Sequence, residues 1–135
     1  MNRTSGRRRW ILIVLTMAAT CCSPANLTEL QKVKSGMLDV VLLSPRDALR
    51  HGSDTFVIEF RSAPGDLVDV GTVRASASMS MSGTPMMGTI DVARTDVPGR
   101  YAATSEFSMA GTWRMTIQWD GPAGTGSVTF PGSVQ

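Results

Sequence analysis

Methionines crowd one short stretch of this 135-residue chain, V-R-A-S-A-S-M-S-M-S-G-T-P-M-M-G at positions 73–88. It holds four of the nine methionines in the chain: Met79, Met81, Met86 and Met87. A thioether sulfur is a soft donor, and with neutral imidazole it selects Cu(I) over Zn, Mg or Ca. A further methionine, Met109, and the only histidine, His51, lie elsewhere in the chain. These residue types predict a Cu(I) site, with copper as the one candidate cofactor, if the fold brings them together.

Core packing is the competing explanation for the same methionines. Met79 and Met81 continue the alternation of Val73, Ala75 and Ala77, and methionine fills gaps well in a small core. We expect Met79, and Met115 further along the chain, to pack in the core.

Ligation and packing remain equally open for Met81 and Met109. Met86 and Met87 are adjacent in the chain, so on a strand they point to opposite faces and cannot both be core residues. We favour Met86 as the ligand of the two. His51 is either an exposed loop residue or a ligand, and Met37 is expected to pack within a strand.

Period-two hydrophobic patterns dominate the chain beyond residue 36. In T-W-R-M-T-I-Q-W (112–119), Trp113, Met115, Ile117 and Trp119 fall on one side and the polar residues on the other. Such alternation predicts a strand with one buried face and one wet face. The same pattern predicts seven strands, at 37–43, 54–61, 72–79, 87–93, 100–106, 112–119 and 126–130.

Proline and glycine punctuate the gaps between these segments, as in Pro64-Gly65, Pro98-Gly99 and Gly121-Pro122. Short, evenly spaced strands with such turns predict an all-β fold, a seven-stranded immunoglobulin-like antiparallel β-sandwich. The segment D-V-P-G-R-Y (96–101) also resembles the tyrosine corner of immunoglobulin-like domains.

Strand parity gives the methionines a common location. If consecutive strands run antiparallel, the first, third and fifth connections lie at one end of the sandwich. These are residues 44–53, 80–86 and 107–111, which contain His51, Met81, Met86 and Met109, with Met79 beside them. Parity therefore predicts that the soft-ligand candidates converge at that end.

The N-terminus is typical of an export signal. Arginines at 3, 7, 8 and 9 precede an apolar run, Trp10 to Thr20, which is short for a membrane span of about 20 residues. Cys21 or Cys22 follows small residues and is a candidate for lipidation. We expect 1–22 to be a signal peptide or lipoprotein signal, 23–36 a tether with a loose helical turn, and 37–135 the β-sandwich domain. The protein is then periplasmic or extracytoplasmic, and anchored to the membrane by a lipid or an uncleaved signal.

Charge and missing motifs exclude several classes of function. Once the four N-terminal arginines are set aside, nine of the 13 basic residues remain. With the 11 acidic residues they give a formal net charge of −2. No basic stripe remains for phosphates, so we expect no nucleic-acid partner. The sequence contains no Gly-rich phosphate loop, no CxxC and no HExxH, so we expect that it is not an enzyme.

Four segments together carry a family resemblance: F-V-I-E-F (56–60), V-x-A-x-x-S-M-x-M-x-G-x-P-M (73–86), P-G-R-Y (98–101) and M-A-G-T-W-R-M-T-I (109–117). The pattern resembles the YtkA-like/FixH-like family of bacterial extracytoplasmic domains over about residues 37–130. The resemblance implies a small exported or membrane-anchored β-sandwich linked to copper handling, metal efflux or assembly of copper-containing oxidases. Family hairpins often read M-x-M-P-x-M, whereas Ser82 stands at the proline position here.

Two functions are compatible with these observations. In the first, an exported, membrane-associated protein binds Cu(I) weakly through Met79, Met81, Met86, Met109 and His51. In the second, an immunoglobulin-like adaptor docks a membrane efflux or oxidase-assembly partner, and its methionines form an apolar contact surface without metal.

Overall fold

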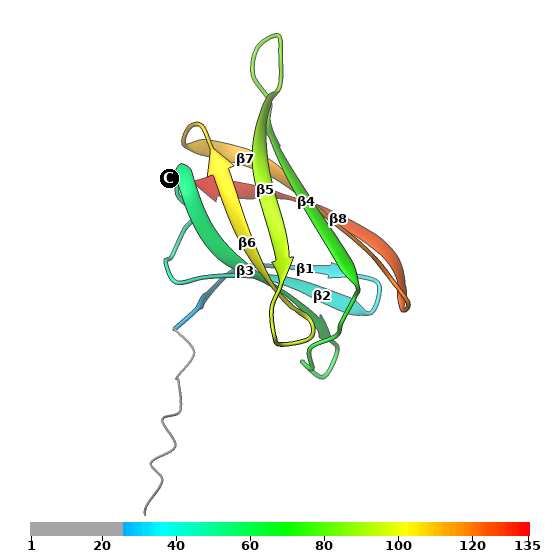
Figure 1. Ribbon diagram of the computed structural model, residues 1–135. Coiled ribbons are helices and arrows are strands. Elements are labelled where there is room, and N and C mark those ends of the chain that lie inside the picture. The colour runs from blue at the N-terminus through cyan, green and yellow to red at the C-terminus, as the bar shows by residue number, and fades with distance from the viewer. Residues whose placement is uncertain (1–25) are drawn as a thin grey trace, which may run out of the picture.

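The computed structural model describes residues 26–135 and contains eight β-strands in that range. None of its elements is a helix, so residues 26–135 offer no apolar helix of membrane-crossing length. The strands, shown in Figure 1, are β1 (Thr28–Ser35), β2 (Leu38–Ser44), β3 (Gly52–Ser62), β4 (Thr72–Met79), β5 (Met86–Arg94), β6 (Arg100–Phe107), β7 (Gly111–Gly121) and β8 (Gly124–Val134). The all-β prediction is confirmed, and each of the seven expected segments forms a strand.

One strand was not expected, so the count is eight rather than seven. Residues 23–36 were predicted to be a tether with a loose helical turn, but Thr28–Ser35 forms β1 and pairs antiparallel with β2. The helical spacing of Leu30 and Val33 misled the prediction. A bulge between Glu29 and Gln31 shifts the register. The side chains of Leu30 and Val33 therefore both pack against the core from a strand.

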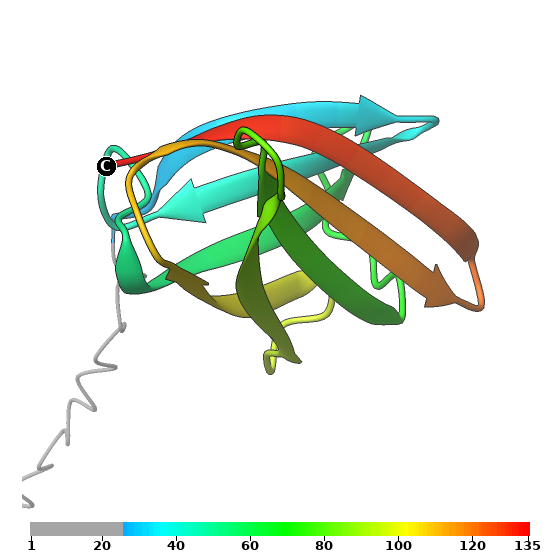
Figure 2. The ribbon, with the colours of Figure 1, turned by 90° about the horizontal axis from the view of Figure 1, so that it is seen from above.

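Every strand pairs antiparallel with its neighbours, in the order β1-β2-β3-β6-β5-β4-β7-β8. The series β2-β3-β6-β5 followed by β4-β7-β8 is the strand order of the two sheets of an immunoglobulin constant-type sandwich. Here the β4–β5 hairpin joins the two halves into one continuous sheet. The sheet curls until its edge strands, β1 and β8, lie side by side (Figure 2).

Alternating inward residues from both halves build one core. Trp113, Met115, Ile117 and Trp119 are all buried on β7, as the period-two pattern predicts. Phe60 on β3 is fully buried and meets Trp119 edge-on, with ring centroids 5.2 Å apart. The core is therefore continuous between the two halves of the sheet.

The end of the sandwich that holds the β3–β4 and β5–β6 connections is fixed by polar contacts. The hydroxyl of Tyr101 donates to the carbonyl of Gly71 at 2.8 Å and lies 3.3 Å from Asp69 Oδ1. Burial is the main cause that raises the pKa of Tyr101. The predicted tyrosine corner at 96–101 is wrong. Tyr101 is the second residue of β6, the fifth strand of the immunoglobulin-like set, and its hydroxyl bonds a residue 30 positions earlier rather than a few.

Buried carboxylates hold both ends of β3. Glu59 is 3% exposed and pairs with Arg61 at 2.8 Å and Arg100 at 3.1 Å. Asp54, near the other end of β3, accepts from Arg46 at 2.7 Å and from the backbone N–H of Arg50 at 2.9 Å. Because those two arginines belong to the β2–β3 connection, Asp54 fixes the loop that leads to His51.

Candidate functional site

The β2–β3, β4–β5 and β6–β7 connections lie at the same end of the sandwich, which we call the methionine end. The register shows this directly, because Gly52 is paired with Phe107, and Met79 with Met86, where those strands terminate. The parity prediction for these three connections is therefore confirmed. The β4–β5 hairpin protrudes furthest at this end (Figure 1).

Met79 and Met86 face each other as the last paired residues of the β4–β5 hairpin. Both are half-buried, and both pack against the hydrophobic core. Met79 also reaches across to β7: a Cβ placed on Gly111 would lie 2.7 Å from its methyl carbon. The expected core packing of Met79 is thus only partial, because its strand ends at the rim of the core.

The β6–β7 turn, residues 108–110, packs against this methionine pair. The hydroxyl of Ser108 donates to Met86 Sδ at 2.8 Å. The next residue, Met109, is 39% exposed, and its carbonyl accepts a hydrogen bond from Trp113 Nε1 at 3.1 Å. The buried Trp113 ring therefore holds the backbone of the turn in place. We define the candidate site as Met79, Met86, Ser108 and Met109.

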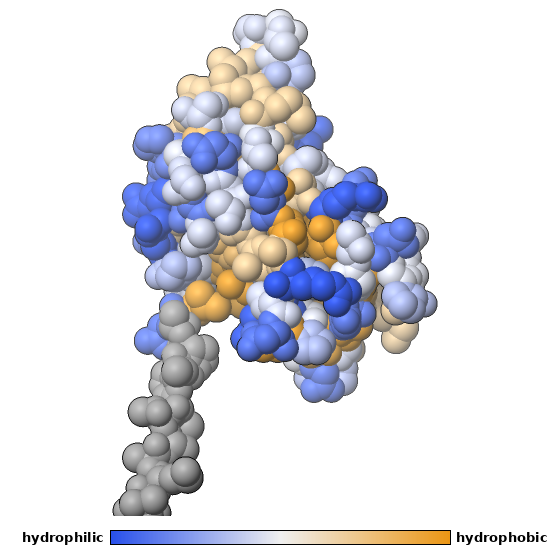
Figure 3. Space-filling view, viewed as in Figure 1, coloured by the Kyte–Doolittle hydropathy of each residue, from blue (hydrophilic) through white to orange (hydrophobic). Residues whose placement is uncertain are grey.

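Met81 and Met87 lie outside the candidate site. Met81 is 47% exposed in the loop beyond Met79. Met87 is 66% exposed and points to the opposite face from Met86, as expected for adjacent strand residues. In Figure 3 this end of the molecule carries an apolar patch below the polar tip of the hairpin.

His51 is exposed at the methionine end, directly before the start of β3. Its Nδ1 lies 3.0 Å from the carbonyl oxygen of Gln135, and its backbone N–H donates to the same oxygen at 2.8 Å. Because a carbonyl oxygen only accepts, Nδ1 is the donor in this contact, and Nε2 is the ring nitrogen that it leaves unused. No described contact brings this nitrogen to a methionine sulfur.

Hard or borderline ligands do not gather in the described part of the chain. Within residues 26–135 there is no group of three or more His, Cys, Asp or Glu side chains that could hold a metal ion. Besides the imidazole of His51, the donors at the methionine end are thioether sulfurs and hydroxyl oxygens, and the soft thioethers suit Cu(I) better than Zn²⁺ or Ca²⁺.

Two contacts that shape the site were not predicted from the sequence. They are the hydrogen bonds made by the Ser108 hydroxyl and by the ring nitrogen of Trp113. Trp113 was expected only as a core residue, which it is, at 0% exposed. Ser108 belongs to no motif, and only the pairing of β5 with β6 brings it to Met86. Met37, expected to pack within a strand, is instead 84% exposed in the β1–β2 turn, so that prediction is wrong. The proposed lipidation sites, Cys21 and Cys22, lie outside the described residues.

Two solved structures are similar to the chain at low levels. The filamin domain of Lin-41 is 16% identical, with a TM-score of 0.43, over 65% of this chain and 81% of that domain. Domains 4 and 5 of the S-layer protein SbsC are 18% identical, with a TM-score of 0.41, over 81% of this chain and 53% of that structure. No curated protein sequence matches the chain significantly.

The match to a protein family is more extensive. The YtkA-like family model covers residues 32–118, which is more than half of the 135 residues. That range runs from β1 through most of β7 and includes the whole β4–β5 hairpin and the β6–β7 turn. The chain belongs to the YtkA-like family.

Proposed function

We propose that the chain is an exported, membrane-associated accessory protein that binds Cu(I) weakly through thioethers and acts without catalysis. Met79, Met86 and Met109 supply the sulfur atoms. The observation that carries the proposal is the pairing of Met79 with Met86, against which the β6–β7 turn packs through the Ser108–Met86 contact. These contacts bring the two ends of one hairpin together with a turn more than 20 positions further along the chain.

The donor chemistry fits Cu(I). Thioether sulfurs are soft, carry no charge and form no disulfides in an oxidising compartment. Met79 and Met86 are half-buried on the rim of the core, while Met109 is 39% exposed. A site with two partly sheltered ligands and one exposed ligand suits weak, exchangeable binding more than permanent storage.

Met81 and His51 extend the site in this proposal. Met81 is exposed near the tip of the protruding hairpin, which suits first contact with an ion or a donor protein. Metal-ligating histidines commonly donate their other ring N–H to a backbone carbonyl, which is the contact that His51 makes with Gln135. His51 is then a further ligand from the β2–β3 connection at the same end of the sandwich.

Anaerobic Cu(I) titration tests the proposal by competition with a colorimetric Cu(I) chelator. Met79→Leu/Met86→Leu keeps side-chain volume, and such swaps usually cost under about 1.5 kcal/mol of stability. We expect this variant to lose at least roughly tenfold in Cu(I) affinity, since even changes behind the ligands cost 10–100-fold at metal sites.

Met37→Leu/Met87→Leu is the matched control, because one residue lies in the distant β1–β2 turn and the other faces away from Met86. It should bind Cu(I) like the unmodified chain. Equal affinity in the two double variants, or no binding by the unmodified chain, would refute the copper site.

A second candidate function rests on the exposure of Met81, Met87 and Met109. Methionine surfaces are flexible and polarisable, and they adapt to apolar partners. In this alternative the methionine end docks a membrane efflux or oxidase-assembly protein without metal. Because leucine preserves apolar contact, docking would survive Met→Leu changes that abolish copper ligation.

A further inference from the structure

The outer face of β4, β7 and β8 is rich in hydroxyl groups and almost free of acid. Outward positions alternate with the buried residues of each strand, and most carry Ser or Thr: Ser76, Ser78, Thr112, Thr116, Ser127 and Thr129. The only charged residues among the outward positions of these three strands are Arg74, Arg114 and Asp120. This face lies on the opposite side of β4 from Met79, so it is separate from the candidate copper site.

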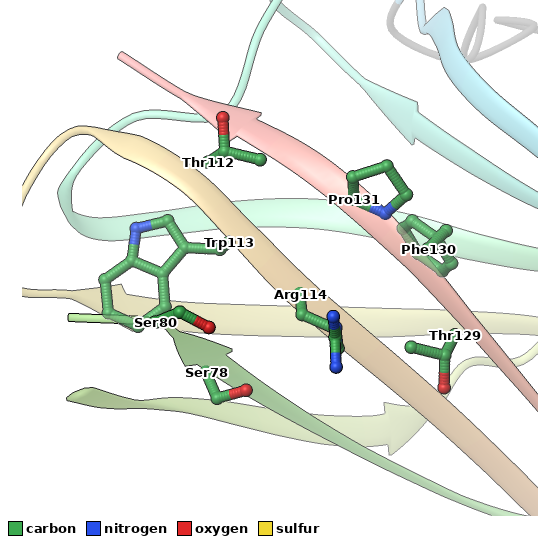
Figure 4. A pocket seen from close by; sticks show the side chains of 8 residues that line it. All are labelled: Ser78, Ser80, Thr112, Trp113, Arg114, Thr129, Phe130 and Pro131. Carbon is green, nitrogen blue, oxygen red and sulfur yellow. The ribbon is translucent and has the colours of Figure 1, made fainter. Parts of the chain in front are cut away.

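A groove of about 590 Å³ opens on this face near the methionine end. Figure 4 shows Arg114 among its lining side chains, with Ser78 of β4 on one side and Thr129 of β8 on the other. Arg114 is paired with Ser78 of β4 on one side and with Pro131 of β8 on the other. The lining comprises Ser78, Ser80, Thr112, Arg114, Thr129 and Pro131, together with the buried Trp113 and Phe130.

The side chain of Arg114 is exposed and makes no salt bridge within residues 26–135. Every salt bridge within residues 26–135 uses another basic side chain. No acidic residue lines the groove. The one acid on this face, Asp120, is six positions along β7, or roughly 20 Å at the strand rise. The groove therefore presents five N–H donors and several hydroxyls to an anion.

We propose that this groove binds a carboxylate ligand, with Arg114 as its anchor. A guanidinium pairs with a carboxylate through two parallel hydrogen bonds, and the hydroxyls around it can donate to a second carboxylate. One cation matches one carboxylate charge. A phosphate dianion would need a second cation, and Arg74 lies four positions away on β4 from Ser78, roughly 14 Å.

The volume accommodates a small organic acid, since pockets for small ligands span roughly 300–1,000 Å³. The same chemistry is offered by glutamate or aspartate side chains in an acidic peptide segment. Both ligands present a carboxylate to the same guanidinium, so the experiment titrates each of them separately.

The test is a titration of the isotope-labelled full chain at constant ionic strength, in which NMR monitors the backbone amide shifts. One arm uses sodium succinate and the other uses the peptide acetyl-Gly-Glu-Gly-Glu-Gly-amide. We expect saturable shifts confined to the amides of Ser78, Thr112, Arg114 and Thr129. Saturation by succinate alone identifies a free acid as the ligand, and saturation by the peptide alone identifies an acidic segment.

Two variants decide the role of the guanidinium. Arg114→Gln should weaken binding by roughly tenfold or more, because it removes a charged hydrogen-bond donor. Arg74→Gln makes the same charge change on the same face outside the groove, and it should alter affinity by less than about twofold. The proposal is overturned if neither ligand saturates, if binding survives Arg114→Gln, or if both variants weaken it equally.

Discussion

Single side chains at the β3–β4 connection show how local contacts hold one end of the sandwich. Asp69 is exposed, yet its Oδ1 accepts the backbone N–H of Gly71 at 3.0 Å and pairs with Arg94 at 3.2 Å. The Gly71 N–H is the main cause that holds the pKa of the Asp69 carboxyl below its usual value, and Arg94 acts in the same direction. Asp69 therefore joins β4 to the end of β5.

Asp69→Asn tests this contact through the pH dependence of stability. A carboxyl with a lowered pKa in the folded state stabilises the fold above its unfolded pKa, which is about 3.9, and loses that effect as pH falls through the folded value. We expect Asp69→Asn to unfold at lower urea than the unmodified chain at pH 7, with the difference shrinking below about pH 4. A constant difference from pH 7 to pH 3 would show that the carboxylate charge has no role.

The β4 strand is anchored differently at its two ends. At its start, Gly71 adopts a φ of +88°, and a Cβ there would lie 2.5 Å from the carbonyl oxygen of Asp120. At the far end, Gly83 in the hairpin loop has a φ of +100° with nothing within 4 Å of such a Cβ. The first position is closed by backbone packing against β7, while the hairpin loop projects into open space.

Alanine at these two glycines separates conformational strain from packing. Gly83→Ala should cost about 1–2 kcal/mol of unfolding free energy, the penalty of left-handed backbone for a residue with a Cβ. Gly71→Ala adds a backbone clash and should cost about 1–3 kcal/mol more, which is the typical penalty of overpacking. Urea unfolding followed by tryptophan fluorescence measures both, and equal costs would contradict the close approach of β4 and β7.

Residues 26–135 form a curled sheet with two chemically distinct surfaces near one end. The inward side of the β4–β5 hairpin carries Met79 and Met86. The outer face of β4 borders the groove around Arg114. β4 thus separates a soft, neutral donor set from a cationic, hydroxyl-rich groove. In our proposals an ion and a carboxylate ligand would occupy opposite sides of one strand.

Global stability offers a test of the copper proposal that does not depend on a chelator. A ligand that binds only the folded state stabilises it by mass action, by about 2.7 kcal/mol at a free concentration of one hundred times Kd. Anaerobic Cu(I), or Ag(I) as a redox-inert substitute, should raise the Tm of the unmodified chain, whereas Zn²⁺ and Mg²⁺ should not. The rise should be lost in Met79→Leu/Met86→Leu, and a rise that persists in that variant would place the ion elsewhere.

The sequence by itself determined the strands after residue 36 and the strand parity. Side chains on a strand alternate with a period of two, so one buried face leaves a pattern that can be counted, as in Trp113, Met115, Ile117 and Trp119. The gathering of His51, Met79, Met86 and Met109 at one end follows from that count and from antiparallel pairing. The YtkA-like resemblance likewise rested on short sequence motifs, which can be read without knowing the fold.

Only the tertiary structure decided what the pattern leaves open. β1 is amphipathic with a bulge, so its hydrophobic spacing matches a loose helix, and pairing with β2 selects the strand. The contacts of Ser108 with Met86 and of His51 with Gln135 join residues 22 and 84 positions apart. The partners of Arg114 are fixed by the order in which β4, β7 and β8 pair. Local periodicity encodes which face a residue occupies, while long-range register, which depends on how the whole sheet closes, decides which residues it meets.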